Sequence, residues 1–235
     1  RYAGLGATSY NDFNSGLSAD NISIGLGRML EWPDNYFSLT HSLGFVVYRL
    51  ENYTNSGLGC PNCSPNAITL NTTLSRNSID NQMYPTQGSM ISLSLTLTPP
   101  YSAFNGMDYE TATAEEKNKW QEYHKWMFDA RYYLPLDNKK KLVLEAKVHF
   151  GFLGAYNFEK TGIGPFERFV LGGSGLAGGF NSFVLGKEII GLRGYQDNQI
   201  TPPRYLPGNS QTQTGGVVYE KLGVELRYPV TTGNA

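Results

Sequence analysis

The stretch Lys141–Phe152, which reads KLVLEAKVHFGF, decides the fold class of this 235-residue chain. Its apolar residues fall at every second position: Leu142, Leu144, Ala146, Val148, Phe150 and Phe152. Glu145, Lys147 and His149 lie between them. Because successive side chains of a strand point to opposite faces, we expect a long strand with one apolar and one charged face.

Seven further segments carry a related alternation of apolar and polar residues. They are residues 2–13, 21–30, 36–50, 66–75, 90–98, 120–134 and 217–228. Most of the eight segments are 9–15 residues long, whereas strands of soluble proteins are usually about 5–6 residues long. A tilted membrane-spanning strand needs about 9–11 residues, so strand length predicts an all-β, antiparallel transmembrane β-barrel.

The connections between these segments alternate in length. The short ones are residues 31–35, 80–88 and 136–140, the long ones are 51–65, 100–118 and 153–213, and the short link 14–20 falls on the long side. Short turns at one end and long loops at the other are typical of outer-membrane barrels. Aromatic residues recur near the segment ends, as they do at membrane interfaces.

Charge indicates which face meets lipid. An ionised Lys that faces lipid at mid-bilayer costs about 2–4 kcal/mol, so we expect the charged face to line an aqueous lumen. The residues expected there are Asp129, Arg131, Glu145, Lys147 and His149. The alternative is a soluble β-sandwich or lipocalin-like barrel with its apolar face inside, which the strand lengths and the long connection 153–213 disfavour.

Composition excludes other classes of protein. Charged residues make up 17% of the chain, below the roughly 25% of soluble domains, and the net charge of −1 gives no electrostatic case for nucleic acid. The apolar runs are too short for a transmembrane helix. Because the chain begins at Arg1 and lacks a terminal element, we expect a partial barrel domain over residues 1–235, with the missing strands and any N-terminal domains elsewhere in a longer protein.

Cys60 and Cys63 are separated by a Pro and an Asn in a predicted loop. A small disulfide is the favoured interpretation, while a redox or metal role and two free thiols remain open. One C-x-x-C supplies too few ligands for a structural zinc site, so no metal is expected. Residues 173–178, GSGLAG, match a dinucleotide fingerprint, but no flanking segment predicts the helix that such a site needs, so no cofactor is expected.

Several motifs carry a resemblance to a known family. The stretch 165–173, PFERFVLGG, is followed by the tetrapeptide 192–195, LRGY, and three shorter motifs are YNDF at 10–13, YPTQG at 84–88 and LRYP at 226–229. In their order and spacing along the chain, these motifs resemble those of the BamA family of outer-membrane barrel assembly proteins. The chain departs from the family pattern at Leu192, where Val is usual, in an insertion at about Gly175–Gly191, and in the cysteine loop.

The resemblance implies strands five to twelve of a sixteen-strand barrel, integral to the outer membrane of a Gram-negative bacterium. It implies a core component of the BAM complex that folds and inserts outer-membrane proteins. Its partners would be unfolded clients, accessory lipoprotein subunits and the bilayer. Alternatives are a related secretion or translocation barrel and a passive porin or receptor channel. An enzyme is not expected, because no Ser lies in a G-x-S-x-G setting.

The resemblance also implies a lock between the long loop and the barrel wall. In the family the loop folds into the lumen and its motif Arg pairs with an inward acid. We expect Arg193 to pair with Glu225, which falls on the polar face of segment 217–228. Gly194 would let the backbone approach the wall, and Tyr195 would pack its ring there. The alternative is that Arg193 is an ordinary solvated loop arginine.

Overall fold

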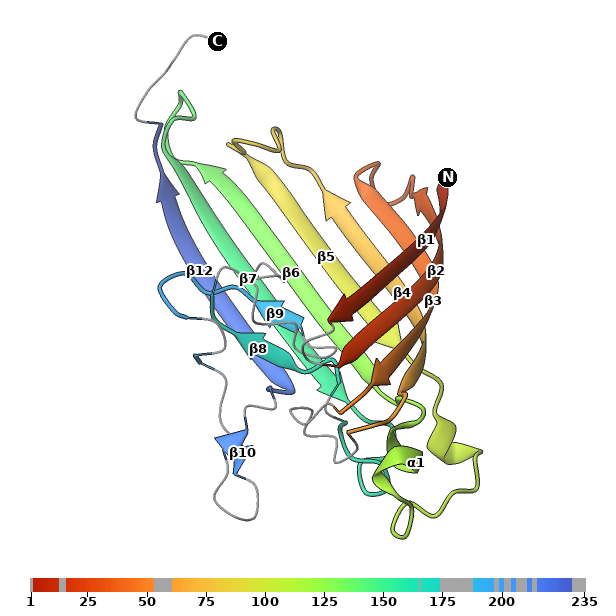
Figure 1. The fold of residues 1–235 in the computed structure, drawn as a ribbon. Helices are drawn as coiled ribbons and strands as arrows, with labels where there is room; N and C mark the ends of the chain where they lie inside the picture. The colour runs from red at the N-terminus through yellow and green to blue at the C-terminus, as the bar shows by residue number, and fades with distance from the viewer. Residues whose placement is uncertain are drawn as a thin grey trace.

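The structure, a computed structural model, describes residues 2–12, 16–52, 61–164, 166–173, 188–196, 199–200, 204–205, 211–212 and 215–229. Within these residues one antiparallel eight-stranded sheet has the order β1-β2-β3-β4-β5-β6-β7-β12 (Figure 1). Its strands are β1 Tyr2–Asp12, β2 Leu17–Met29, β3 Phe37–Leu50, β4 Asn66–Asn77, β5 Gly88–Leu97, β6 His124–Pro135, β7 Val143–Gly154 and β12 Val218–Arg227. The fold class predicted from the sequence is therefore confirmed, although this sheet is not closed.

The connections contain shorter elements. They are the 3-10 helix η1 Tyr101–Ala103, the helix α1 Ala114–Asn118, and the strands β8 Phe169–Leu171, β9 Glu188–Ile190, β10 Arg204–Tyr205 and β11 Gln211–Thr212. β8 and β9 pair in parallel, apart from the main sheet. None of the helices in the described part of the chain is both long and apolar enough to cross a bilayer.

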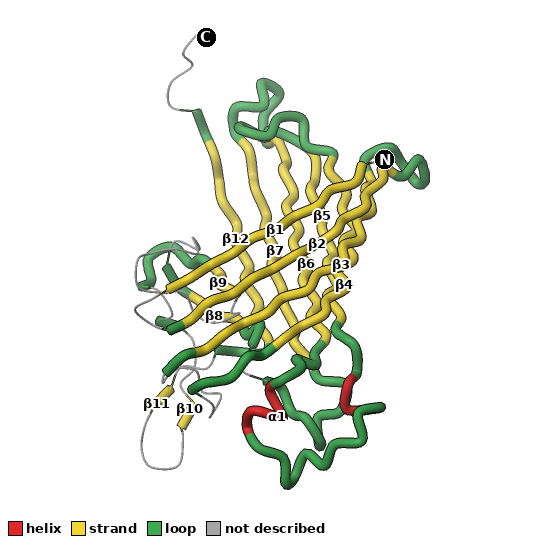
Figure 2. The backbone as a smooth tube through the Cα atoms, turned by 45° about the vertical axis from the view of Figure 1, so that its right-hand side comes forward, coloured by secondary structure: helices red, strands yellow, loops and turns green. Residues whose placement is uncertain are grey.

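The two faces of the sheet differ in polarity. On β5, Leu93 is 40% exposed and lies in register between Leu74 and Phe128 on the neighbouring strands. The next residue, Ser94, points to the other face, where its hydroxyl accepts hydrogen bonds from Thr73 and Asn71. Figure 2 shows the sheet curving into a trough, and its polar face is the concave one, because β8 packs there.

Two strands begin four residues away from the expected position, and one helix was not expected. β2 begins at Leu17 instead of residue 21, which shortens the link from β1. β6 begins at His124 instead of residue 120, because Trp120 leaves the strand direction and bridges in parallel to Asn66. The helix α1 was not expected; Thr113 caps it, and Glu116 completes the capping box.

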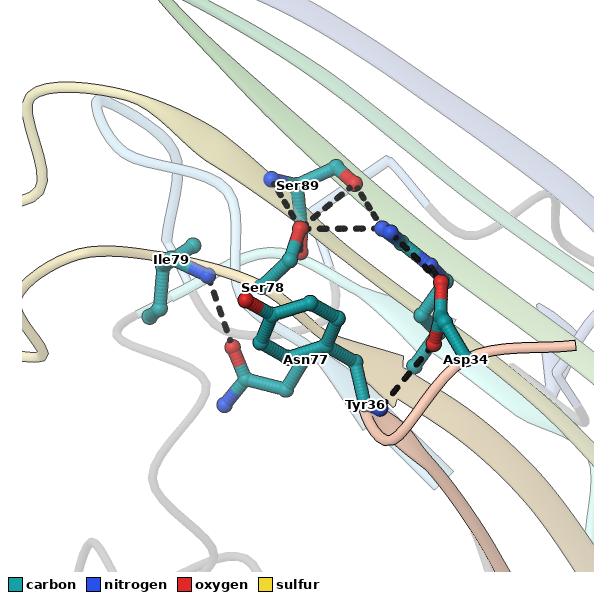
Figure 3. A network of polar contacts seen from close by, with 7 residues as sticks. Asp34, Tyr36, Asn77, Ser78, Ile79 and Ser89 are labelled. Carbon is teal, nitrogen blue, oxygen red and sulfur yellow. Dashed lines mark hydrogen bonds and ion pairs between the residues drawn. The ribbon is translucent and has the colours of Figure 1, made fainter. Parts of the chain in front are cut away.

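At the turn end of the sheet a polar network surrounds Arg76, and Figure 3 labels its partners Asp34, Ser78 and Ser89. Arg76 donates from Nε to Asp34 at 2.9 Å, and from Nη1 to Ser78 at 2.9 Å and to Ser89 at 3.0 Å. The backbone N–H of Tyr36 donates to the same Asp34 carboxylate. Arg76 lies on the convex face, at the end of the apolar wall. These partners provide its guanidinium group with hydrogen bonds, and they also attach the turn 31–35 to β4 and β5.

Candidate functional site

The candidate site is the long connection between β7 and β12 where it packs on the concave wall. Two of its motifs, separated by the insertion, are joined by backbone hydrogen bonds. Gly173 N–H donates to the carbonyl of Tyr195 at 3.0 Å, and Leu192 N–H donates to the carbonyl of Gly173 at 3.0 Å. β8 and β9 pair directly before this junction. Residues 175–187 of the insertion lie outside the described residues.

Phe169 of β8 is the apolar anchor of the connection. Its side chain is fully buried, in a cluster with Tyr123, Leu153 and Tyr219. The ring centroids of Phe169 and Tyr219 are 4.6 Å apart in an edge arrangement. Gly151 leaves room for both rings, since a Cβ there would lie 2.1 Å from Tyr219 and 2.8 Å from Phe169. The wall of β7 and β12 is therefore shaped to receive β8.

Phe166 contacts the opposite part of the sheet. It packs with Leu50, Cys63 and Tyr48, and its ring centroid is 5.5 Å from that of Tyr48 on β3. Four strands separate β3 from β12 in the sheet order, yet Phe166 and Phe169 are only three residues apart in the sequence. The connection therefore contacts both arms of the curved sheet.

Cys63, the cysteine in this cluster, is buried and disulfide-bonded. Cys60 is the other cysteine of the chain and lies outside the described residues. The Cys63 end of the C-x-x-C loop thus supports the surface on which Phe166 rests.

A buried cation links the connection to β6. Lys125 Nζ lies 2.9 Å from a carboxylate oxygen of Glu167 and 2.8 Å from one of Glu188. The side chain of Lys125 is only 5% exposed, and its ammonium group also lies 5.4 Å from the ring centroid of Phe169. Because a buried ammonium is stable only when it is paired, this contact fastens both β8 and β9 to the wall.

Two further cations hold the backbone of the connection. Lys221 of β12 donates to the carbonyl of Gly191 at 2.5 Å, two residues before Arg193. Arg168 donates to the carbonyls of Gly164 and Ile163, both at 2.7 Å. The loop is thus attached to the wall by side chains of β6 and β12 and is held together internally by Arg168.

The charged residues expected in the lumen share the concave face. Lys147 and Glu145 lie 3.5 Å apart, Asp129 and Arg131 3.3 Å apart, and the His149 ring is 2.9 Å from the Tyr219 hydroxyl. Tyr219 touches Phe169, which places this row of side chains on the face that carries the loop.

Glu145 is the centre of the charge cluster and is 1% exposed. It accepts a hydrogen bond from the Tyr133 hydroxyl at 2.9 Å and forms an ion pair with Arg227. The position opposite Glu145 on β12 is Glu225, so the two acids depend on Lys147 and Arg227 to compensate their repulsion.

The expected pair of Arg193 and Glu225 is not formed within the described residues. Glu225 lies 2.7 Å from Lys147 and 3.4 Å from Arg227, which are its neighbours on the wall. Arg193 is exposed in a turn. The physical reason is local. Lys147 and Arg227 already compensate the charge of Glu225, so a third cation would add little to its stability.

The expected roles of the next two residues also change. Gly194 has a positive φ of 93°, and no atom lies within 4 Å of the place that a Cβ would take, so the turn geometry requires it, not a close approach to the wall. Tyr195 is 48% exposed, and the ring on the wall belongs to Phe169.

Lys125 was not predicted as a site residue from the sequence. It lies an even number of positions from Asp129 and Arg131 on the same strand, so its side chain points to the same face.

These features together define a class of protein. An antiparallel sheet with an apolar convex face, wrapped around an inwardly folded loop, is the wall of a transmembrane β-barrel. The Omp85 superfamily domain matches residues 7–234. The chain belongs to the Omp85 superfamily.

A solved structure extends this result at the level of the fold. The chain is similar to BamA from Haemophilus ducreyi lacking POTRA domains 1–3, with a TM-score of 0.62 and 17% sequence identity. The match covers 98% of this chain and 42% of that one. The resemblance to BamA barrels expected from the motifs is thereby confirmed, and the chain spans less than half the length of that structure.

Proposed function

We propose that this chain is part of an outer-membrane protein that folds and inserts other β-barrels, as the core component of a barrel assembly machinery. The observation that carries the proposal is the fastening of the long connection to the concave wall through Lys125 and Phe169. A loop held inside the arc by a buried ion pair and a buried ring suits a rigid scaffold better than an open solute pore.

The physical task is to lower the barrier for burying polar backbone in lipid. An unfolded strand that enters hydrocarbon leaves its N–H and C=O groups without partners, which costs several kcal/mol for each group. A neighbouring strand edge that offers hydrogen bonds removes that cost. The wall described here would hold the barrel in shape while the client pairs elsewhere on it. No covalent bond is made or broken, so we propose a role without enzymatic chemistry.

Partners follow from this task. They are unfolded outer-membrane proteins, the bilayer of a Gram-negative outer membrane, and accessory lipoprotein subunits of the machinery. The Omp85 superfamily match supports the clients and the bilayer as partners, but it also fits a secretion or translocation barrel.

The test uses the full-length protein reconstituted in liposomes with its accessory subunits. An unfolded client barrel is added, and its folded fraction is followed by its heat-modifiable mobility on gels. We expect faster client folding than in empty liposomes, and slower folding with Lys125→Met than with the matched surface change Lys139→Met. Swelling in small solutes without client folding would instead indicate a porin, and release of a soluble passenger would indicate a secretion barrel.

A further inference from the structure

A cavity of about 470 Å³ lies at the loop end of the sheet, beside the loop anchor, and its lining includes Tyr123, Leu153 and Phe166 of the anchor clusters. Its walls come from the connection between β5 and β6, which carries α1, and from the segment just after β7. The residues that give it chemical character are Tyr109, Lys117, Trp120, Gln121, Tyr123 and Lys160. None of them takes part in the contacts of Lys125 or in the ion pairs of the concave wall.

Gln121 is the residue that points to a ligand. It is 6% exposed, and its Nε2 has no hydrogen-bond partner among the described residues. Buried side-chain donors nearly always have a partner. Gln121 lines the cavity; its Nε2 is itself covered, so a rotation of the side chain would be needed to bring the unpaired amide to an acceptor bound there.

The cavity also carries an excess of positive charge. Lys117 and Lys160 line it, and neither has a carboxylate within ion-pair distance among the residues described. The carboxylate on the same wall, Glu122, is occupied by Ser102, which donates from its backbone N–H at 2.7 Å and from its hydroxyl at 2.8 Å. An anionic group would therefore meet two ammonium groups and one lining carboxylate, Glu122, while Asp108 lies close enough to Lys117 to interact with its charge.

Aromatic rings complete the lining. Trp120 is held by a ring contact with Tyr101 at 5.1 Å between centroids, and Tyr123 is 7% exposed. Ring surfaces beside a few convergent donors are typical of small-molecule sites. Rings suit the apolar faces of a sugar, an amide donor suits a hydroxyl or carbonyl oxygen, and ammonium groups suit a phosphate or carboxylate.

We propose that this cavity binds a small anionic saccharide, a sugar that carries a phosphate or a carboxylate. The sugar could belong to a glycolipid headgroup in the membrane or be free in solution, and both present the same chemistry to the site. The proposal does not depend on the function proposed above, because it rests on the lining of the cavity alone.

The experiment titrates the full-length protein in detergent with glucose 6-phosphate, glucuronate, glucose and inorganic phosphate, by calorimetry. We expect saturable binding of the two anionic sugars, with glucose and inorganic phosphate at least tenfold weaker. Gln121→Leu should weaken binding of the anionic sugars about tenfold. The double change Lys117→Gln with Lys160→Gln should remove the preference over glucose, while Lys119→Gln, outside the lining, should leave binding unchanged.

Two outcomes would overturn the proposal: no saturable binding of either anionic sugar, or binding of inorganic phosphate as tight as that of glucose 6-phosphate. Thermal unfolding checks that Gln121→Leu is folded, and the lysine pair provides an independent test on the surface if it is not. Competition by lipopolysaccharide in nanodiscs then identifies the source. Displacement of the bound sugar supports a glycolipid headgroup, and binding that persists supports a free saccharide.

Discussion

The ammonium group of Lys125 on β6 lies 2.8 Å from the carboxylate of Glu188 on β9, although 63 positions separate the two residues in the sequence. The same ammonium group lies 2.9 Å from Glu167, directly before β8. Both strands of the small parallel sheet are therefore fastened to one buried side chain of the wall. This contact, not the exposed Arg193, carries the charge-assisted attachment of the loop.

Removing Lys125 should destabilise the barrel. Lys125→Met leaves Glu167 and Glu188 without their cation, and because these acids are 25% and 38% exposed, we expect a cost below the about 3–5 kcal/mol of a fully buried pair. We expect a clear fall in the melting temperature of the full-length protein, measured by heat-modifiable gel mobility. Lys139→Met, in the exposed turn after β6, should leave it within error. Equal melting of the two variants would show that the triad does not hold the loop.

Truncating Phe169 should weaken the packing of the long connection on the concave wall. Phe169→Ala empties a fully buried site, and such changes cost about 3–5 kcal/mol. We expect faster cleavage of the connection by added protease and a lower melting temperature. Phe158→Ala, at a side chain that is 70% exposed, is the matched control. If both variants resist protease as the parent does, the cluster is not the anchor.

A double-mutant cycle distinguishes the two possible partners of Glu225. For Lys147 and Glu225, 2.7 Å apart on an exposed part of the wall, we expect a coupling of about 0.2–1 kcal/mol. For Arg193 and Glu225 we expect additive effects, within about 0.3–0.5 kcal/mol. Chemical unfolding of the single and double variants gives both values. A coupling above about 1 kcal/mol for Arg193 would restore the lock expected from the motif.

Asp80 should make the turn between β4 and β5 sensitive to acid. Partial burial raises the pKa of its carboxyl, but hydrogen bonds from the hydroxyl and backbone N–H of Thr86 and the N–H of Gln87 outweigh this and lower the pKa to about 2. A depressed folded pKa gives stability above the unfolded value of about 3.9, and this stability is lost as pH falls through about 2.

The measurement is the melting temperature of the full-length protein between pH of about 2 and 5. Asp80→Asn should flatten the dependence on pH in this window, whereas Glu159→Gln, at an exposed loop carboxylate, should preserve it. Identical curves for Asp80→Asn and the parent would count against the role of Asp80.

The sheet was predictable because its signal is local. Apolar and polar residues such as Leu93 and Ser94 alternate because successive side chains of a strand point to opposite faces. Pairing of neighbouring strands in register then keeps the apolar residues together on one face of the sheet. The helix α1 carried a readable signal as well, since Thr113 and Glu116 have the spacing of a capping box. Strand ends were harder, because the bridge of Trp120 to Asn66 depends on a distant segment.

The loop anchor was only partly predictable. The alternation of faces along the strand places Lys125 on the polar face, and the PFERF motif contains Phe166, Glu167 and Phe169. Neither feature predicts which residues of the motif contact Lys125. That choice depends on how far the sheet curves and where the connection returns. Glu225 was assigned to Arg193 from the motif, whereas its actual partner Lys147 follows from the register of β7 and β12.

The apolar convex face of the sheet meets lipid, and the polar concave face meets water. The most direct test places nitroxide labels at Leu93→Cys and Ser94→Cys in the full-length protein in liposomes, and compares collision with oxygen and with a polar nickel complex. We expect the label at 93 to favour oxygen and the label at 94 to favour the nickel complex. The reverse order would contradict the account.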